Sequence, residues 1–141
     1  MTAQFDFGDR VALVTGASGA LGSAVAEAFG AAGATVCGID VVAPTDDDAL
    51  VDPSAVDYYE ADLTEEEQVR EAVTAIVDEH GRLDHLLNVA GTWRGGDPID
   101  ETDTETFDFL FGVNLKTMFL ASKHAIPHLR ETEGSIVSVS S

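Results

Sequence analysis

The stretch Val11-Ala-Leu-Val-Thr-Gly-Ala-Ser-Gly-Ala-Leu-Gly22 decides the fold of this chain. Val11–Val14 is an apolar run that predicts a buried strand. A glycine-rich turn follows, and then an expected helix whose apolar face is Leu21, Val25, Ala28 and Ala32. Such a unit directs backbone N–H groups and the positive end of the helix dipole at an anion. We expect it to hold the pyrophosphate of a dinucleotide; an ordinary βα turn with packing glycines is the alternative.

Three glycines of this stretch are spaced three residues apart, at Gly16, Gly19 and Gly22. The first permits a tight turn, and small residues near the helix start let the backbone approach a phosphate. Glycine spacing alone is weakly specific, so the hypothesis rests on the whole strand–turn–helix unit. The residues of this turn that we expect to contact a cofactor are Gly16, Ser18, Ala20, Leu21 and Gly22.

Short apolar runs alternate with helical patterns along the chain. The expected strands are Val11–Val14, Thr35–Ile39, Asp57–Glu60, Asp84–Asn88 and Ser135–Ser140. Strands separated by helices predict right-handed crossovers, and therefore a parallel sheet with helices on both faces. We expect a Rossmann-type doubly wound α/β fold with strand order 3-2-1-4-5. Residues 1–141 would form a single NAD(P)-binding domain, incomplete at its C-terminal end and truncated after the fifth strand, which becomes an edge.

Local signals delimit the first two helices. The first is expected to end near Gly30–Gly33. The second is expected to begin at Thr64, with Glu67 completing a capping box, and to stop at Gly81. Residues 41–56 contain two prolines and three consecutive aspartates, which predicts a loop or a poorly formed helix.

A long third helix is expected from about Thr104 to Leu129. Its apolar stripe is Phe107, Leu110, Phe111, Met118, Ala121 and Ala125, and Asn114 lies within it. A buried amide needs hydrogen-bond partners, so Asn114 is a functional candidate, with a helix-kinking structural role as the alternative. His124 and His128 have the spacing of metal ligands, but no third ligand is evident, and surface histidines near a helix end explain them better.

Composition excludes several classes of function. The chain carries 26 acidic and 7 basic residues, a net charge of −19, which is the wrong sign for a nucleic-acid surface. It has no long apolar run that would span a membrane. No signal peptide is visible at the N-terminus, so we expect a cytoplasmic protein. The single cysteine, Cys37, lies in an apolar run and is expected to be buried and reduced.

The acidic composition favours adaptation to a salt-rich cytoplasm; an ordinary acidic, soluble protein is the alternative. Repulsion among 26 acidic side chains opposes folding, and salt screens that repulsion. We therefore expect the thermal unfolding midpoint to be higher in molar KCl than in dilute buffer. Melting curves in the two solutions check this, and an unchanged midpoint would refute the halophilic interpretation.

Asp40 ends the second expected strand, and its position relative to the glycine turn suits a ribose contact. A carboxylate there accepts hydrogen bonds from the adenosine ribose hydroxyls and repels a 2′-phosphate, so it favours NAD over NADP. NADP binding by loop residues is disfavoured because no arginine or lysine occurs from Val11 to Glu67. A solvated aspartate at a strand end is the structural alternative.

Six segments together resemble the short-chain dehydrogenase/reductase family over essentially the whole chain. They are Thr15-Gly-Ala-Ser-Gly-Ala-Leu-Gly22, Asp40, Asp62-Leu63, Asn88-Val-Ala-Gly91, Val113-Asn-Leu-Lys116 and Gly134-Ser-Ile-Val-Ser-Val-Ser-Ser141. The resemblance implies an oxidoreductase that transfers hydride between NAD and a secondary alcohol or ketone, and homo-oligomers of the longer protein. One departure is Ala20, where the main branch usually has glycine, so a sugar-nucleotide epimerase-like enzyme stays an alternative.

The resemblance also implies roles for single residues. Asp62 and Leu63 would flank the adenine; a purely local turn role before Thr64 is the alternative for Asp62. Asn88 would tie neighbouring strands together, and Ala90 and Gly91 would pass close to the cofactor.

Two further residues are implied to be catalytic. Asn114 would take part in a water-bridged proton relay. Ser141 would hydrogen-bond the substrate carbonyl oxygen as charge develops, with Ser140 as the less favoured choice. The family's Tyr-x-x-x-Lys pair does not occur in these 141 residues, so we expect this chain by itself to be inactive. A non-catalytic dinucleotide-binding module is the competing interpretation.

Overall fold

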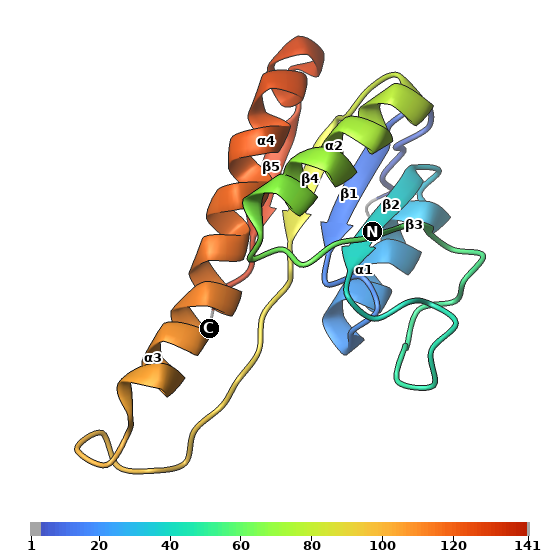
Figure 1. Cartoon of the computed structure of the whole chain (residues 1–141). Helices are drawn as coiled ribbons and strands as arrows, with labels where there is room; N and C mark the ends of the chain where they lie inside the picture. Colours follow the sequence, from blue (N-terminus) through green and yellow to red (C-terminus); the bar gives the residue numbers. More distant parts are fainter. Residues whose placement is uncertain (1–3, 141) are drawn as a thin grey trace.

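The computed structural model describes residues 4–140. Their five strands form one sheet (Figure 1). Its strands are β1 (Val11–Thr15), β2 (Thr35–Asp40), β3 (Asp57–Glu60), β4 (His85–Asn88) and β5 (Ser135–Ser138). All neighbouring pairs are parallel, and the order is β3-β2-β1-β4-β5. The predicted doubly wound α/β fold and strand order are therefore confirmed.

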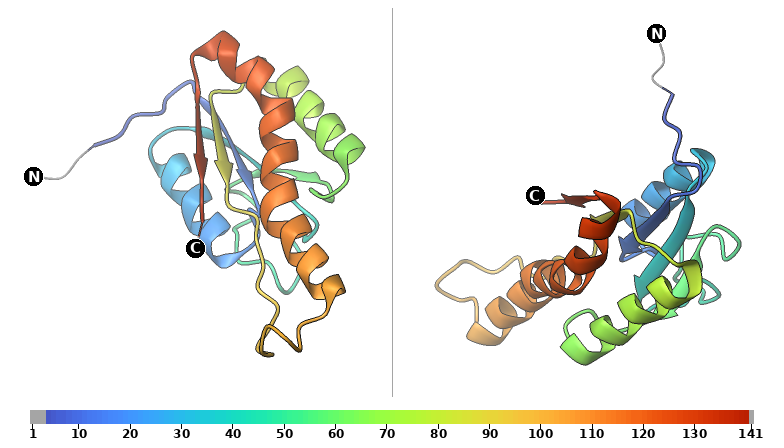
Figure 2. Two further views of the ribbon diagram at one scale, coloured as in Figure 1. Left: turned by 90° about the vertical axis from the view of Figure 1, so that its left-hand side faces the viewer. Right: turned by 90° about the horizontal axis from the view of Figure 1, so that it is seen from above.

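Helices cover both faces of the sheet (Figure 2). They are α1 (Ala20–Ala31), α2 (Glu66–His80), α3 (Thr104–Phe111), the π-helical segment η1 (Gly112–Lys116) and α4 (Thr117–Thr132). The helix α1 lies on one face, whereas α2 and α4 lie side by side on the other. Among the described residues, no helix is both long and apolar enough to cross a bilayer.

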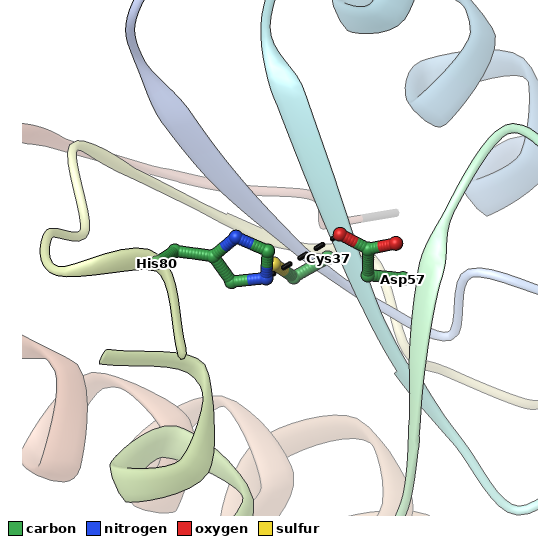
Figure 3. A group of neighbouring side chains, drawn as sticks. All are labelled: Cys37, Asp57 and His80. Atoms are coloured by element: carbon green, nitrogen blue, oxygen red, sulfur yellow. Dashed lines mark ion pairs between the residues drawn. The ribbon is translucent and has the colours of Figure 1, made fainter. Parts of the chain in front are cut away.

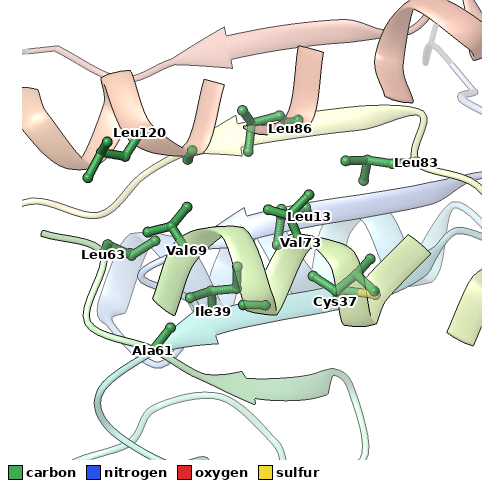
Figure 4. Close-up of a cluster of buried hydrophobic side chains, with 14 of the residues drawn as sticks. Leu13, Cys37, Ile39, Ala61, Leu63, Val69, Val73, Leu83, Leu86 and Leu120 are labelled. Atoms are coloured by element: carbon green, nitrogen blue, oxygen red, sulfur yellow. The ribbon is translucent and has the colours of Figure 1, made fainter. Parts of the chain in front are cut away.

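The two faces of the sheet carry separate cores because side chains alternate along each strand. In β1, Leu13 packs in the core below α2 and α4, while Val14 packs in the core below α1. Figure 4 shows the larger core, in which Leu86 and Leu120 pack with α2 and the central strands. Burying a leucine side chain stabilises the fold by about 1.5–3 kcal/mol. Because each face of the sheet has its own core, the central strands are apolar on both sides.

Four expected strand ends are wrong by one or two residues. The strands β1 and β2 each extend one residue further than expected, to Thr15 and Asp40. The strand β4 begins at His85, and not at Asp84, because the Asp84 carboxylate turns back to accept from the Val11 backbone N–H at 2.9 Å. The strand β5 ends at Ser138 and not at Ser140. It lies at the edge of the sheet, as expected, with Ile136 and Val137 exposed.

The predicted apolar face of the first helix is wrong in part, since of its four residues only Val25 packs against the core. Leu21 is half exposed and Ala28 is exposed, whereas the buried residues of α1 are Gly22, Ser23 and Ala26. The helix lies so close to the glycine turn that only small side chains fit between them. Close packing against the turn therefore decides which residues are buried at the start of α1, while Val25 and Phe29 pack against the core further along the helix.

The predicted capping box of the second helix is also wrong. The helix α2 begins at Glu66, and its N-cap residue makes no side-chain capping bond. Thr64 instead donates from both its backbone N–H and its hydroxyl to the Asp62 carboxylate, and Glu67 pairs with Arg70. Gly81 ends the helix in the left-handed conformation, at φ 77°, as expected.

The expected long third helix is divided by the π-helical segment and extends to Thr132. Pro127 lies inside α4 rather than at its end. Residues 41–56 are irregular, which agrees with the predicted loop. Cys37 is fully buried as expected; burial, and then the nearby Asp57 and Glu79 carboxylates, raise the pKa of its thiol to about 12.

Candidate cofactor site

The glycine turn is shaped by a close approach of the first and fourth strands. Gly16 adopts φ 67°, and a Cβ there would lie 2.8 Å from the Ala90 Cα. Its backbone N–H donates to the Ile39 carbonyl at 2.8 Å, which joins the turn to β2. Glycine is therefore required at this position both by its conformation and by the space available.

Gly22 fixes the start of α1 against the same turn. A Cβ at this position would overlap the Gly16 carbonyl oxygen. The N-cap residue, Gly19, provides no side-chain capping bond, so the N–H groups of Ala20, Leu21 and Gly22 have no intrahelical acceptor. These three N–H groups and the helix dipole fit the pyrophosphate of a dinucleotide. The groups available to an anion here are these backbone N–H groups, because the Leu21 side chain is apolar and half exposed.

Asp40 stands at the end of β2 beside the turn. One carboxylate oxygen, Oδ1, accepts from the backbone N–H groups of Val41 at 2.8 Å and Val42 at 3.2 Å. The other, Oδ2, accepts from the Ser18 N–H at 3.1 Å. A carboxylate has about four acceptor directions, so Oδ2 keeps one free direction while the side chain is held in place.

Ser18, which is expected to contact a cofactor, makes three hydrogen bonds within the chain. It is buried, and its hydroxyl donates to the Val42 carbonyl at 2.7 Å. Its own carbonyl accepts from the Leu50 N–H at 2.8 Å. Ser18 thus ties the turn to the loop after β2 and holds Asp40 in position.

Thr15, which the sequence did not single out, organises the end of β4. Its buried hydroxyl oxygen accepts from the backbone N–H groups of Val89 at 3.0 Å and Ala90 at 3.1 Å. Asn88 is also buried and donates to the hydroxyls of Ser122 at 3.2 Å and Ser138 at 3.1 Å. Asn88 therefore joins β4 to β5 and α4, which agrees with the expected tie between strands.

Asn114 is exposed, so the expectation that it lies in a buried stripe is wrong. Its amide nevertheless has two partners. It accepts from the Thr92 N–H at 2.8 Å and donates to the Thr92 carbonyl at 2.9 Å. This two-bond clamp connects η1 to the segment that follows β4. π-Helical turns are often found at functional sites.

A cavity of about 940 Å³ opens at the carboxyl ends of the strands. It is bordered by five of the residues expected at the cofactor site, namely Asp40, Asp62, Leu63, Ala90 and Gly91. Across from them it is lined by η1 and by Phe109, whose ring the Arg94 guanidinium covers at 3.9 Å. Clefts at this edge of a doubly wound sheet are where such folds bind ligands.

The remaining expected residues lie elsewhere. Ser141 lies outside the described residues. His124 does not pair with His128; its Nε2 lies 3.1 Å from the Glu66 carboxylate, which also binds Lys123. These contacts join α4 to α2.

The parallel sheet, the glycine turn and the cleft define a dinucleotide-binding domain of the Rossmann type. A family model described as short chain dehydrogenase matches residues 10–141. The chain belongs to the short-chain dehydrogenase/reductase family, whose fold implies a nicotinamide dinucleotide cofactor.

Individual relatives agree with this assignment. The chain is 36% identical over 140 residues to an uncharacterised oxidoreductase, YxjF, of Bacillus subtilis, covering 94% of this chain and 53% of that protein. It superposes on ligand-free aldohexose dehydrogenase of Thermoplasma acidophilum with TM-score 0.85 and 33% identity, covering 96% and 50%. An NADH-dependent reductase of alginate metabolism gives TM-score 0.85 and 26% identity, covering 96% and 59%. The chain spans about half the length of the curated relatives it matches.

Proposed function

We propose that this chain supplies the NAD-binding part of an oxidoreductase that transfers hydride between the nicotinamide and a secondary alcohol or ketone. The observation that carries the proposal is the Asp40 carboxylate, held at the end of β2 by the backbone N–H groups of Ser18, Val41 and Val42. We further propose that the whole protein is cytoplasmic, and that it forms homo-oligomers, as the family resemblance implies.

The preference for NAD over NADP follows from charge. The free acceptor direction of Asp40 suits a ribose hydroxyl, whereas a 2′-phosphate would meet a fixed negative charge. No arginine or lysine between Val11 and Glu67 could compensate for it. The NADH-dependent reductase with the same fold is consistent with this preference.

The other site residues would hold the dinucleotide at separate points. The N–H groups of Ala20, Leu21 and Gly22 would bind the pyrophosphate, and Asp62 and Leu63 would border the adenine. Bound nicotinamide supplies the hydride acceptor or donor.

Two residues would serve the substrate end of the site. We propose that Ser141 binds the substrate oxygen. Asn114, through its clamp on Thr92, would keep the wall of the cleft in place. The proton-relay role of Asn114 stays a prediction.

Titrating NADH and NADPH into the chain tests the cofactor preference. We expect NADH to bind more tightly. The variant Asp40→Ala should reduce that preference about 5- to 150-fold, because a charge-assisted hydrogen bond of about 1–3 kcal/mol is lost and phosphate repulsion is relieved. Fluorescence of the reduced nicotinamide gives both affinities directly.

Asp47→Ala is the matched control, because it removes the same charge from the exposed loop after β2. It should leave the ratio of the two affinities unchanged. If NADPH binds the unmodified chain as tightly as NADH, or if the two variants change the ratio equally, the role assigned to Asp40 is wrong.

A further inference from the structure

Three side chains with different metal-binding atoms meet on the face of the sheet that α2 covers (Figure 3). Cys37 in β2 is paired in register with Asp57, the first residue of β3. His80 is the last residue of α2, and it projects toward both (Figure 3). Because α2 runs antiparallel to the strands, its C-terminal end returns to the amino ends of β2 and β3. The fold therefore brings together three residues that are far apart in the sequence.

The spacing of the three donor atoms is close to that of a tetrahedral metal centre. The cysteine sulfur, the histidine nitrogen and the carboxylate oxygen all lie within 4.8 Å of one another. His80 Nε2 lies 3.4 Å from Asp57 Oδ2. Zinc bonds of about 2.0–2.3 Å place tetrahedral ligands about 3.3–3.6 Å apart. The histidine–aspartate pair already has this spacing, and both of its atoms lie within 4.8 Å of the sulfur, so closing the site around the sulfur needs a movement of about 1 Å.

The burial of the three residues allows that approach. Cys37 has no exposed surface, so the packed core holds its sulfur. The Asp57 side chain is 54% exposed and can rotate toward it. The metal would therefore bind to one fixed ligand and two that close around it from the surface side.

We propose that Cys37, Asp57 and His80 form a binding site for a zinc-class divalent cation. A thiolate, an imidazole and a carboxylate suit zinc, and also cobalt as a substitute, whereas magnesium and calcium prefer sites made of oxygen ligands. On binding, the metal forms a bond to the sulfur while the Cys37 thiol releases its proton to solvent. His80 binds as the neutral imidazole, and Asp57 binds as the carboxylate.

Neighbouring groups complete the surroundings of this site. The Tyr59 hydroxyl lies 3.2 Å from His80 Nε2 and donates a hydrogen bond to the Glu79 carboxylate. A metal on His80 Nε2 would replace the contact of that nitrogen with the Tyr59 hydroxyl, leaving the imidazole proton on Nδ1, and Tyr59 and Glu79 could then hold a water molecule in the fourth position. The site lies toward the amino ends of the strands, away from the cleft beside Asp40. We thus assign it a structural role, fastening the end of α2 to the edge of the sheet at β3.

Cobalt titration of the reduced chain tests this site. We expect saturation at one Co²⁺ per chain, with the visible spectrum of a tetrahedral ion and a thiolate-to-cobalt charge-transfer absorption, both removed by Zn²⁺. The chain contains a single cysteine, so that absorption can come only from Cys37. No charge-transfer absorption at millimolar cobalt would overturn the proposal.

Ligand variants make the test specific. Cys37→Ser should lose the charge-transfer absorption. His80→Gln and Asp57→Asn should each weaken cobalt binding at least about 10-fold, because one of three protein ligands is removed. His128→Gln and Asp78→Asn are the matched controls on α4 and α2, and they should bind like the parent. Equal cobalt affinities of His80→Gln and His128→Gln would exclude His80 as a ligand and refute the site, even if Cys37→Ser fails to fold.

Thermal unfolding provides a second readout that needs no enzyme activity. Zinc at about 100 times its dissociation constant should raise the unfolding midpoint by about 5–10 °C. Magnesium should not raise it, and His80→Gln should not respond to zinc. An equal zinc response of the parent and His80→Gln would contradict the structural role.

Discussion

Gly22→Ala is expected to lower the free energy of unfolding by about 3 kcal/mol and to weaken dinucleotide binding at least about 100-fold. The added Cβ would overlap the Gly16 carbonyl oxygen and would lie 2.9 Å from the Ala17 Cα. Both are backbone atoms of a turn that is hydrogen-bonded to β2, so neither can move without displacing the end of β1. The start of α1 must shift instead, which takes its N–H groups away from the pyrophosphate. Urea unfolding and titration of NADH measure the two effects.

Gly30→Ala provides the control in the same helix. A Cβ at position 30 would meet only the Val36 side chain, at 4.0 Å. Alanine is a better helix former than glycine, so this variant should be neutral or more stable, by about 0.5–1 kcal/mol. If Gly22→Ala and Gly30→Ala unfold at the same urea concentration and bind NADH equally, the close contact between α1 and the turn is not what holds the site.

Asp84→Asn is expected to destabilise the fold by about 2–4 kcal/mol at neutral pH. The carboxylate of Asp84 is completely buried and accepts from Arg82 at 2.6 and 2.8 Å and from Arg10 at 3.2 Å. It also accepts from the Val11 N–H at the start of β1. An asparagine would turn an N–H₂ group toward at least one of these donors and would leave two guanidinium groups without a counter-ion. Chemical unfolding at pH 7 measures the loss.

The pH dependence of the free energy of unfolding should show that the ionised Asp84 carboxylate is the source of the stability lost in Asp84→Asn. Burial acts to raise the pKa of Asp84, but the hydrogen bonds from Arg82, Val11 and Arg10 outweigh it and lower the pKa to about 2. A carboxyl whose pKa is lower in the folded state stabilises the fold above its unfolded pKa, near 3.8, and loses that contribution as the pH falls through about 2. The stability difference between the parent and Asp84→Asn should therefore shrink from pH 4 to pH 2.

Asp78→Asn is the matched control, because it removes an equal charge from an exposed position on α2. It separates the contribution of Asp84 from the change in stability that any chain of net charge −19 undergoes as its carboxylates are protonated. Its difference from the parent should stay small across the same pH range. A constant difference between the parent and Asp84→Asn from pH 7 to pH 2 would contradict the assignment of the lowered pKa to this carboxyl.

The architecture could be predicted because it rests on short, repeated patterns. Parallel strands buried on both faces are continuously apolar, and helices between them impose right-handed crossovers, so the doubly wound parallel sheet followed from the alternation. The strand order followed from assigning the glycine turn to a Rossmann-type fold. The glycine turn and Asp40 belong to one βαβ unit, and the structure brings them together as expected: the Ser18 N–H donates to the Asp40 carboxylate at 3.1 Å. Within a βαβ unit the number of residues between the glycine turn and the end of the second strand determines how close the two lie in space.

Contacts between distant segments were decided only by the tertiary structure. The Thr15 hydroxyl binds the backbone of Val89 and Ala90, and Asn114 clamps Thr92; no local pattern connects these residues. The π-helical segment interrupts a helix that hydrophobic periodicity alone predicted to be continuous.

The sequence by itself therefore determined the fold, the glycine turn and the acidic side chain at the end of β2, because hydrophobic period and turn chemistry act over a few residues. Packing decided which residues are buried at the start of α1, since steric contact with Gly16 outweighs the hydrophobicity of Leu21. Packing also brought Cys37, Asp57 and His80 to one place. That meeting depends on the strand register and on where α2 ends above the sheet, and neither is encoded in the spacing of the three residues.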